Sequence, residues 1–129
     1  MVDSKLNPFV NLDNLAEYIH MQNVSKGFWK DENEVLTAMS AEDAPKVAKA
    51  FKLQRVALVH SELSESVEAL RKDAVDDHLP QYPGFAVELV DSLIRIFDMC
   101  GAYNIPVSKI MEDKLAYNSN RPYKHGKEF

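Results

Sequence analysis

The chain has 129 residues, close to the usual size of one compact domain, and 46% of them are hydrophobic and 27% charged. This composition is typical of a globular protein and excludes wholesale disorder or a fibrous repeat. No apolar run approaches the roughly 20 residues that cross a bilayer, and the start of the chain lacks the apolar core of an export signal. Because Cys100 is the single cysteine, no internal disulfide can form. We therefore expect one domain over residues 1–129, cytoplasmic and without a membrane partner.

The net charge of −5 is unevenly distributed along the chain. The last 16 residues carry four basic side chains against one acidic side chain, so the acidic excess lies in the preceding part. An acidic body disfavours a nucleic acid polymer as a partner, because the phosphate backbone is itself negatively charged. A short basic end suits a small anion better.

Hydrophobic spacing predicts an all-α protein, since glycine and proline are scarce and no segment shows the period-two alternation of a strand. We expect four helices that pack as a compact bundle, with irregular ends over residues 1–11 and 123–129. The polar stretch over residues 30–40 is expected to be a connection. The expected helices cover residues 13–26, 40–73 (with a cap at Ser40 or Asp43), 85–103 and 107–118.

Two of these helices have more apolar surface than one neighbour would bury. In the helix over 85–103 the apolar positions cover roughly 200° of the circumference, about twice what a helix buried on one side needs. Glu62 and Glu65 share one side of the helix over 40–73 with further apolar residues, opposite a main apolar stripe formed by Val56, Val59, Leu63, Val67 and Leu70. The helix over 85–103 is either central to the bundle or partly covered by a second copy, and we expect a homodimer or homotetramer.

Two motifs each place a pair of carboxylates three residues apart on a helix, Glu62-Leu63-Ser64-Glu65 and Glu88-Leu89-Val90-Asp91. At this spacing the side chains share one helix face about 5–6 Å apart at Cβ, where like charges repel unless a cation lies between them. On neighbouring helices, the four carboxylates would form an oxygen-rich site for Mg²⁺, with Mn²⁺ as a substitute. The simpler interpretation is a pair of solvated acidic faces.

The order of these motifs resembles that of the MazG-like, all-α nucleoside triphosphate pyrophosphohydrolases. Glu-x-x-Glu is followed after 22 residues by Glu-x-x-Asp. The sequence Lys26-Gly27-Phe28-Trp29 and the ending Lys114-x-x-x-Asn118-x-x-Arg121-Pro122-Tyr123-Lys124-His125-Gly126-Lys127 also resemble small members of this family. The likeness covers nearly the whole chain from about Leu12 onward.

The resemblance implies Mg²⁺-dependent cleavage of a nucleoside triphosphate between its α- and β-phosphates, which yields the monophosphate and pyrophosphate. The expected metal ligands are Glu62, Glu65, Glu88 and Asp91. Bound metal would neutralise the triphosphate and acidify a water, and Glu62 or Glu65 would orient that water or accept its proton.

The basic ending carries the expected phosphate-binding residues. Lys114, Asn118 and Arg121 lie four and three residues apart, so they share a face if the last helix continues to Arg121, and Lys124 can join them from the tail. Without the resemblance, Lys114 and Arg121 fit equally well as cations that stabilise the C-terminus of a helix.

Trp29 is the candidate for stacking on a nucleobase, with His20 as a second base-binding candidate, although both residues also suit buried structural roles. Arg95 and Asp98 follow Asp91 at helical spacing and are expected to orient the carboxylates. Three alternatives stay open: a phosphoribosyl-ATP pyrophosphohydrolase, a non-catalytic helical interaction module, and a di-iron bundle. The last normally requires Glu-x-x-His, which neither motif provides.

Overall fold

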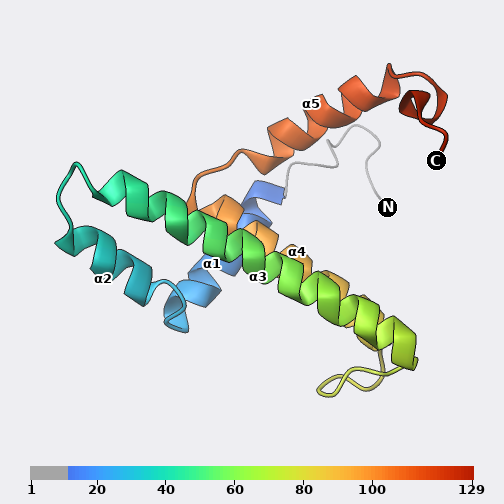
Figure 1. The fold of residues 1–129 in the computed structure, drawn as a ribbon, viewed down its shortest axis with the longest axis horizontal. Coiled ribbons are helices and arrows are strands. Elements are labelled where there is room, and N and C mark those ends of the chain that lie inside the picture. Colours follow the sequence, from blue (N-terminus) through green and yellow to red (C-terminus); the bar gives the residue numbers. More distant parts are fainter. Residues whose placement is uncertain (1–11) are drawn as a thin grey trace.

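The computed structural model describes residues 12–129, and these form five α-helices and one short 3-10 turn (Figure 1). The helices are α1 (Leu12–Ser25), α2 (Lys30–Ala38), α3 (Ala44–Lys72), α4 (Gly84–Ala102) and α5 (Val107–Ser119), followed by η1 (Tyr123–Gly126). The described part contains no strand, which confirms the all-α class. The irregular segment expected over 1–11 lies outside the described residues.

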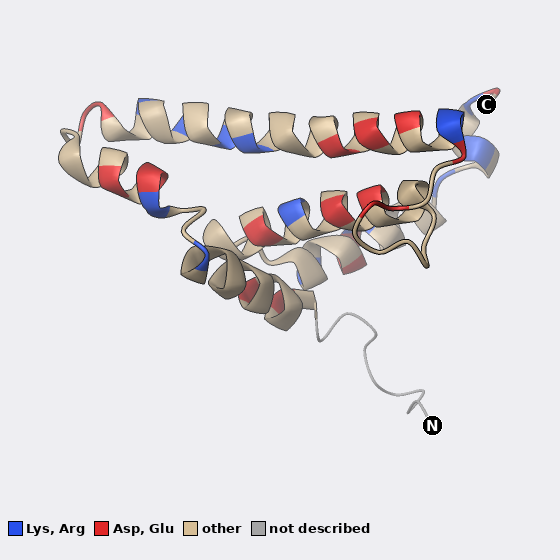
Figure 2. Cartoon of the chain, turned by 90° about the horizontal axis from the view of Figure 1, so that it is seen from below, with Lys and Arg blue, Asp and Glu red and all other residues tan. Residues whose placement is uncertain are grey.

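The body of the protein is formed by α1, α3 and α4, with the long helices α3 and α4 side by side along most of their length (Figures 1 and 2). Small side chains allow these two helices to approach closely, because Ser66 and Ser92 are buried where they pack. Each hydroxyl donates a hydrogen bond to a carbonyl of its own helix, Ser66 to Leu63 and Ser92 to Glu88. The buried polar groups are therefore satisfied without a partner on the facing helix.

The contact between α1 and α4 depends on a glycine. A Cβ atom at Gly101 would lie 2.5 Å from the carbonyl oxygen of Ala16 and 2.7 Å from the Cβ of His20. Ala16 is itself only 2% exposed. The absence of a side chain at Gly101 thus sets how closely the two helices approach.

The prediction that residues 30–40 form a connection is wrong, because most of this stretch is helix α2. Its sequence is polar and has no continuous apolar stripe. Its position depends on an ion pair: Glu32 is 6% exposed, and its Oε1 lies 3.0 Å from Nε of Arg55 on α3. This contact joins residues 23 positions apart, so local hydrophobic spacing could not reveal it.

The expected helical bundle is confirmed in part. The described residues form five helices rather than four, of which α1, α3 and α4 form the bundle, and α5 diverges from α3 and α4 after the break at Asn104–Pro106 (Figure 1). Asn104 has a left-handed φ of 53°, and the chain reverses there. The start of α5 is held to α1 by the amide of Ser108, which donates to Asp13 Oδ1 at 3.0 Å.

Few large apolar side chains are buried in the described chain; the buried apolar residues are Ala16, Trp29, Val59 and Cys100. The main stripe expected on α3 is exposed except at Val59, since Val56, Leu63, Val67 and Leu70 are all 40–58% exposed. On α4, Val90 and Leu93 are about half exposed. Among residues 12–129, no helix combines the length and apolarity needed to span a membrane.

Candidate metal centre and adjoining cleft

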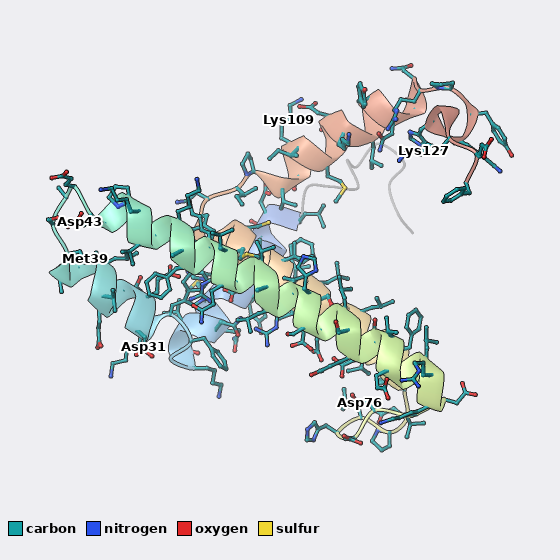
Figure 3. All side chains as sticks on the ribbon, in the orientation of Figure 1. Asp31, Met39, Asp43, Asp76, Lys109 and Lys127 are labelled. Carbon is teal, nitrogen blue, oxygen red and sulfur yellow. The ribbon has the colours of Figure 1, made fainter. Side chains whose placement is uncertain are left out.

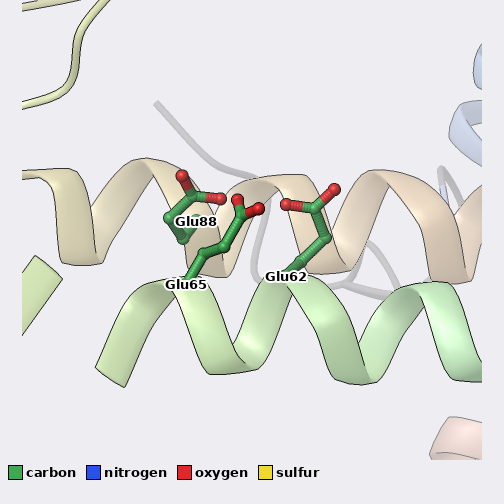
Figure 4. Close-up of side chains that lie close together, drawn as sticks. All are labelled: Glu62, Glu65 and Glu88. Atoms are coloured by element: carbon green, nitrogen blue, oxygen red, sulfur yellow. The ribbon is translucent and has the colours of Figure 1, made fainter. Parts of the chain in front are cut away.

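Three glutamates from α3 and α4 converge between the two helices. Glu62 and Glu65 lie one turn apart on α3, Glu88 lies on α4, and one carboxylate oxygen of each lies within 4.8 Å of the others (Figure 4). In Figure 2 the acidic positions of α3 and α4 lie along neighbouring stretches of the two helices. We call Glu62, Glu65 and Glu88 the carboxylate cluster. Three carboxylates at this separation can coordinate one hard cation such as Mg²⁺, although exposed acidic groups also occur together without one.

Glu88 is the member of the cluster least satisfied by the protein. Its Oε2 is buried and accepts no hydrogen bond from the residues that the structure describes. Burial, with the nearby carboxylates of Glu62 and Glu65, raises the pKa of Glu88 to about 7. An ionised carboxylate with one buried, unpartnered oxygen and other carboxylates beside it is unfavourable, and a divalent ion would relieve this repulsion.

Glu62 differs because it has a cation beside it. Arg95 on α4 donates from Nε to Glu62 Oε1 at 2.8 Å. Burial is the largest single influence and acts to raise the pKa of Glu62. The hydrogen bond and charge of Arg95, together with hydrogen bonds to Glu88 and Glu65, outweigh burial, so the pKa is lowered. Glu62 therefore stays ionised, and Arg95 orients its carboxylate, the role expected from the sequence.

Asp91 lies one turn further along α4 and is not one of the three clustered carboxylates. Its pKa is raised, first by burial and then by the charges of Glu62 and Asp76. The side chain lines the same cleft as Glu62 and Arg95. The structure thus brings three of the four expected ligands together and places the fourth beside them.

A cleft of about 540 Å³ leads from this acidic end along α3 and α4 toward α1 and α2. This volume falls within the roughly 300–1,000 Å³ typical of small-molecule sites. The cleft is lined at one end by Glu62, Asp91 and Arg95, and further along by Leu58, Phe51, Ile94, Met99 and Phe28. The rest of the lining also contains polar and charged side chains, namely Asn23, Asp31, Glu32, Gln54, Arg55 and Asp98. We refer to this cleft as the acidic cleft.

Trp29 is 3% exposed and lies behind this cleft. The guanidinium of Arg55 covers its ring at 3.2 Å from the centroid, while His20 packs edge-on at 4.8 Å. A nucleobase could reach the indole face only by displacing Arg55. Phe28, by contrast, is 68% exposed and lines the cleft, so it is the more accessible aromatic residue for stacking.

Asp98 organises this region, a role that the spacing of the sequence did not distinguish. It is 6% exposed and accepts hydrogen bonds from Nδ2 of Asn23 at 2.9 Å and from Nε1 of Trp29 at 3.0 Å, with Nδ1 of His20 at 2.8 Å. Asp98 thus orders α1 and the start of α2 rather than the carboxylate cluster. A buried carboxylate with several donors is well satisfied, and partners nearly 80 positions away could not be found from local spacing.

The four expected phosphate-binding residues lie together at the far end of α5. The helix ends at Ser119 and does not continue to Arg121, yet one open hollow is lined by Lys114, Asn118, Arg121 and Lys124 with His125, Lys127 and Phe129. Oδ1 of Asn118 is buried there without a hydrogen-bond partner among the described residues. The hydrogen bonds to the Ala116 carbonyl in the last turn come from Ser119 and Asn120 rather than from a cation.

We call residues 107–129 the basic arm. Lys109 near its start and Lys127 near its end mark its extent in Figure 3, and the arm runs away from the α3–α4 pair in Figure 1. Within one chain, therefore, the expected phosphate-binding residues and the carboxylate cluster are not brought together.

Comparisons with protein-family models, with curated proteins and with solved structures found no match to this chain.

Proposed function

We propose that this protein is a Mg²⁺-dependent pyrophosphohydrolase that cleaves nucleoside triphosphates to the monophosphate and pyrophosphate. The observation that carries the proposal is the convergence of Glu62, Glu65 and Glu88 from two helices, with Glu88 Oε2 buried and unpartnered. Its position at the end of a cleft large enough for a nucleoside adds to this. The order of motifs in the sequence favours the same activity.

The residues fit distinct tasks in this reaction. The cluster supplies oxygen ligands, and Mg²⁺ bound there would neutralise phosphate charge and acidify a water. Glu65 is the most exposed member, so it is placed to accept the proton of that water. The water oxygen forms a new bond to phosphorus, and the bond from that phosphorus to the oxygen bridging the α- and β-phosphates breaks. Attack on the α-phosphorus expels pyrophosphate, whereas attack on the β-phosphorus expels the nucleoside monophosphate; both give the same two products. The nucleoside would lie further along the cleft, where Phe28, Phe51 and Leu58 offer apolar contacts beside polar side chains.

The test is pyrophosphate release from a panel of ribo- and deoxyribonucleoside triphosphates, with and without Mg²⁺ or Mn²⁺. The panel also contains phosphoribosyl-ATP, because the same site chemistry would serve that substrate. If phosphoribosyl-ATP is the only member of the panel that is turned over, it replaces nucleoside triphosphates as the substrate of the site. If calorimetry detects no metal binding and no member of the panel is turned over, the enzyme is refuted and a non-catalytic helical module is favoured.

Glu65→Gln gives the matching variant test. Glutamine keeps the size of the side chain but cannot accept the proton or bind the metal as well, so we expect turnover to fall at least about 100-fold. The thermal unfolding midpoint of this variant should not fall below that of the wild type, because the substitution removes one of the negative charges that repel each other in the cluster. Glu68→Gln is the control, since Glu68 lies on the same helix in exposed ion pairs with Arg71 and Lys72. Undiminished activity of Glu65→Gln would remove Glu65 from the site.

A further inference from the structure

Among the residues that the structure describes, two basic side chains line the acidic cleft, Arg55 and Arg95. Arg55 is held by the protein, since Nε donates to Glu32 at 3.0 Å and Nη2 donates to the carbonyl oxygen of Phe28 at 3.3 Å. Its guanidinium also covers the ring of Trp29, and its side chain is only 16% exposed. Of these two cations, Arg95 is therefore the one that can meet a ligand.

Arg95 uses only part of its capacity to donate hydrogen bonds. Nε donates to Glu62 at 2.8 Å, whereas neither terminal nitrogen donates to any residue in the described part of the chain. A guanidinium carries further N–H donors on these two nitrogens, in the same plane as Nε. Because the side chain is 41% exposed and lines the cleft, a ligand in the cleft can accept from them.

The position of Arg95 is the boundary between the acidic end and the rest of the cleft. Among the lining residues of α4, Asp91 precedes Arg95 by one turn, and Met99 follows it by one turn. Because Nε pairs with Glu62, the guanidinium lies beside any cation that the carboxylate cluster holds. In a nucleotide whose polyphosphate lies at the cluster and whose nucleoside lies further along the cleft, the group at this boundary is the α-phosphate.

The local charges favour a phosphate beside Arg95 once a metal is bound. The charge of Arg95 acts on Asp91 as well as on Glu62, so two carboxylates share one guanidinium. A divalent cation at the cluster would neutralise part of this negative charge, which leaves more of the positive charge of Arg95 to act on an incoming anion. The planar, forked donors of arginine match the oxygens of a phosphate group.

We infer that Arg95 donates from its terminal nitrogens to the α-phosphate of the bound nucleotide, while Nε keeps Glu62 oriented. Arg95 then acts on the substrate itself, and it stabilises the charge on the non-bridging oxygens during phosphoryl transfer. That the ligand is a nucleotide rests on the proposed function. The contact between the guanidinium and a phosphate group is a binding interaction, so it can be measured without any turnover.

The test compares a nucleoside 5′-monophosphate, which carries the α-phosphate, with the nucleoside that lacks it. Calorimetry at saturating Mg²⁺ gives both dissociation constants, for the base that the wild type binds most tightly among the common ribo- and deoxyribonucleotides. We expect the wild type to prefer the monophosphate. Arg95→Gln should reduce this preference at least about 10-fold, because charge-assisted hydrogen bonds are lost, and should leave the affinity for the nucleoside unchanged.

Arg71→Gln is the matched control. Arg71 also pairs with a glutamate, Glu68, at 2.7 Å, but this pair is exposed and lies outside the lining of the cleft. The preference for the monophosphate should therefore stay at its wild-type value. Arg95→Lys is a second variant in case Arg95→Gln does not fold; it keeps the charge beside Glu62 but loses the forked donors, so its preference should lie between those of the wild type and Arg95→Gln.

A preference that both substitutions of Arg95 leave unchanged would overturn the inference. Since the measurement is made at saturating Mg²⁺, an effect of these substitutions on metal affinity alone would mean that Arg95 only orients Glu62. A wild type that binds the monophosphate no more tightly than the nucleoside would overturn the inference as well.

Failure of the proposed function gives a different result from failure of this contact. If the preference depends on Arg95 but no triphosphate is hydrolysed, the enzyme is refuted and the phosphate contact stands. If triphosphates are hydrolysed but the preference does not depend on Arg95, the enzyme stands and the phosphate contact is refuted.

Discussion

Glu88 shows most clearly how tertiary structure changes the chemistry of one residue. In the sequence it is one of 20 acidic residues, whereas in the fold one carboxylate oxygen is buried without a partner and the pKa is raised to about 7. The charges that face it are Glu62, Glu65 and Asp91, while Arg95, on the same helix as Glu88, is paired with Glu62. The site therefore stores electrostatic repulsion that a cation would relieve.

This repulsion predicts a pH dependence of stability in the absence of metal. In the unfolded chain Glu88 titrates near its ordinary value of 4.5, so between that value and about 7 the folded protein binds more protons than the unfolded chain. The free energy of unfolding then falls as pH rises through this range. We expect a lower thermal midpoint at pH 7.5 than at pH 5.5 for the metal-free protein, measured by calorimetry with a chelator present.

Glu88→Gln should remove most of this dependence, whereas Glu17→Gln, an exposed change on α1, should retain it. Excess Mg²⁺ should stabilise the wild type more at the higher pH, because binding requires the ionised carboxylate. A midpoint of the metal-free protein that rises between the two pH values would contradict the assignment of Glu88.

At the scale of helices, the body depends on close approach rather than on large buried side chains. Ser66 and Ser92 lie where α3 meets α4, and Gly101 lies where α4 meets α1. Hydrogen bonds and ring contacts around Asp98 and Trp29 then join α1 and the start of α2 to α4. Polar contacts thus do much of what a large apolar core does in other small domains.

Gly101→Ala should destabilise the protein by about 1–3 kcal/mol, because the new methyl group would overlap the Ala16 carbonyl and push α1 away from α4. Urea unfolding followed by circular dichroism measures the change. Gly84→Ala is the control in the same helix, since its nearest contacts, at 3.1 Å, are less severe. An unchanged unfolding free energy for Gly101→Ala would mean that α1 is not packed as described.

At the scale of the whole molecule, exposure of apolar surface is the dominant feature. One exposed stripe on α3, which we call the α3 seam, consists of Leu53, Val56, His60, Leu63, Val67 and Leu70. One chain leaves this seam and much of α4 in contact with water, which a domain of this size can tolerate poorly. Burial of this surface by a second copy would add stability that depends on protein concentration.

Leu63→Glu, in the middle of the α3 seam, should therefore raise the dissociation constant of the expected homo-oligomer by at least about 10-fold, since it places a charge in an apolar contact. Sedimentation velocity over a range of concentrations measures this shift. Ser61→Glu adds the same charge on an exposed face of α3 outside the seam and should leave the assembly intact. Equal behaviour of the two variants would exclude the seam as the contact.

Local spacing determined much of this protein from the sequence alone. The all-α class and four of the five helices in the described part follow from the 3.6-residue periodicity and from the breaks at Gly27, Pro83 and Pro106, because these are properties of neighbouring residues. The two carboxylate pairs were visible for the same reason, since residues three apart must share a helix face.

The tertiary structure decided what periodicity does not encode. Helix α2 depends on the pairing of Glu32 with Arg55, the buried state of Trp29 depends on Asp98, and the direction of α5 depends on the turn at Asn104. The stripe on α3 looked like a core face, yet the helix buries Val59 and Ser66 and leaves most of that stripe exposed. A sequence shows which residues share a face, whereas only packing between distant segments decides which face is buried and which is left for a partner.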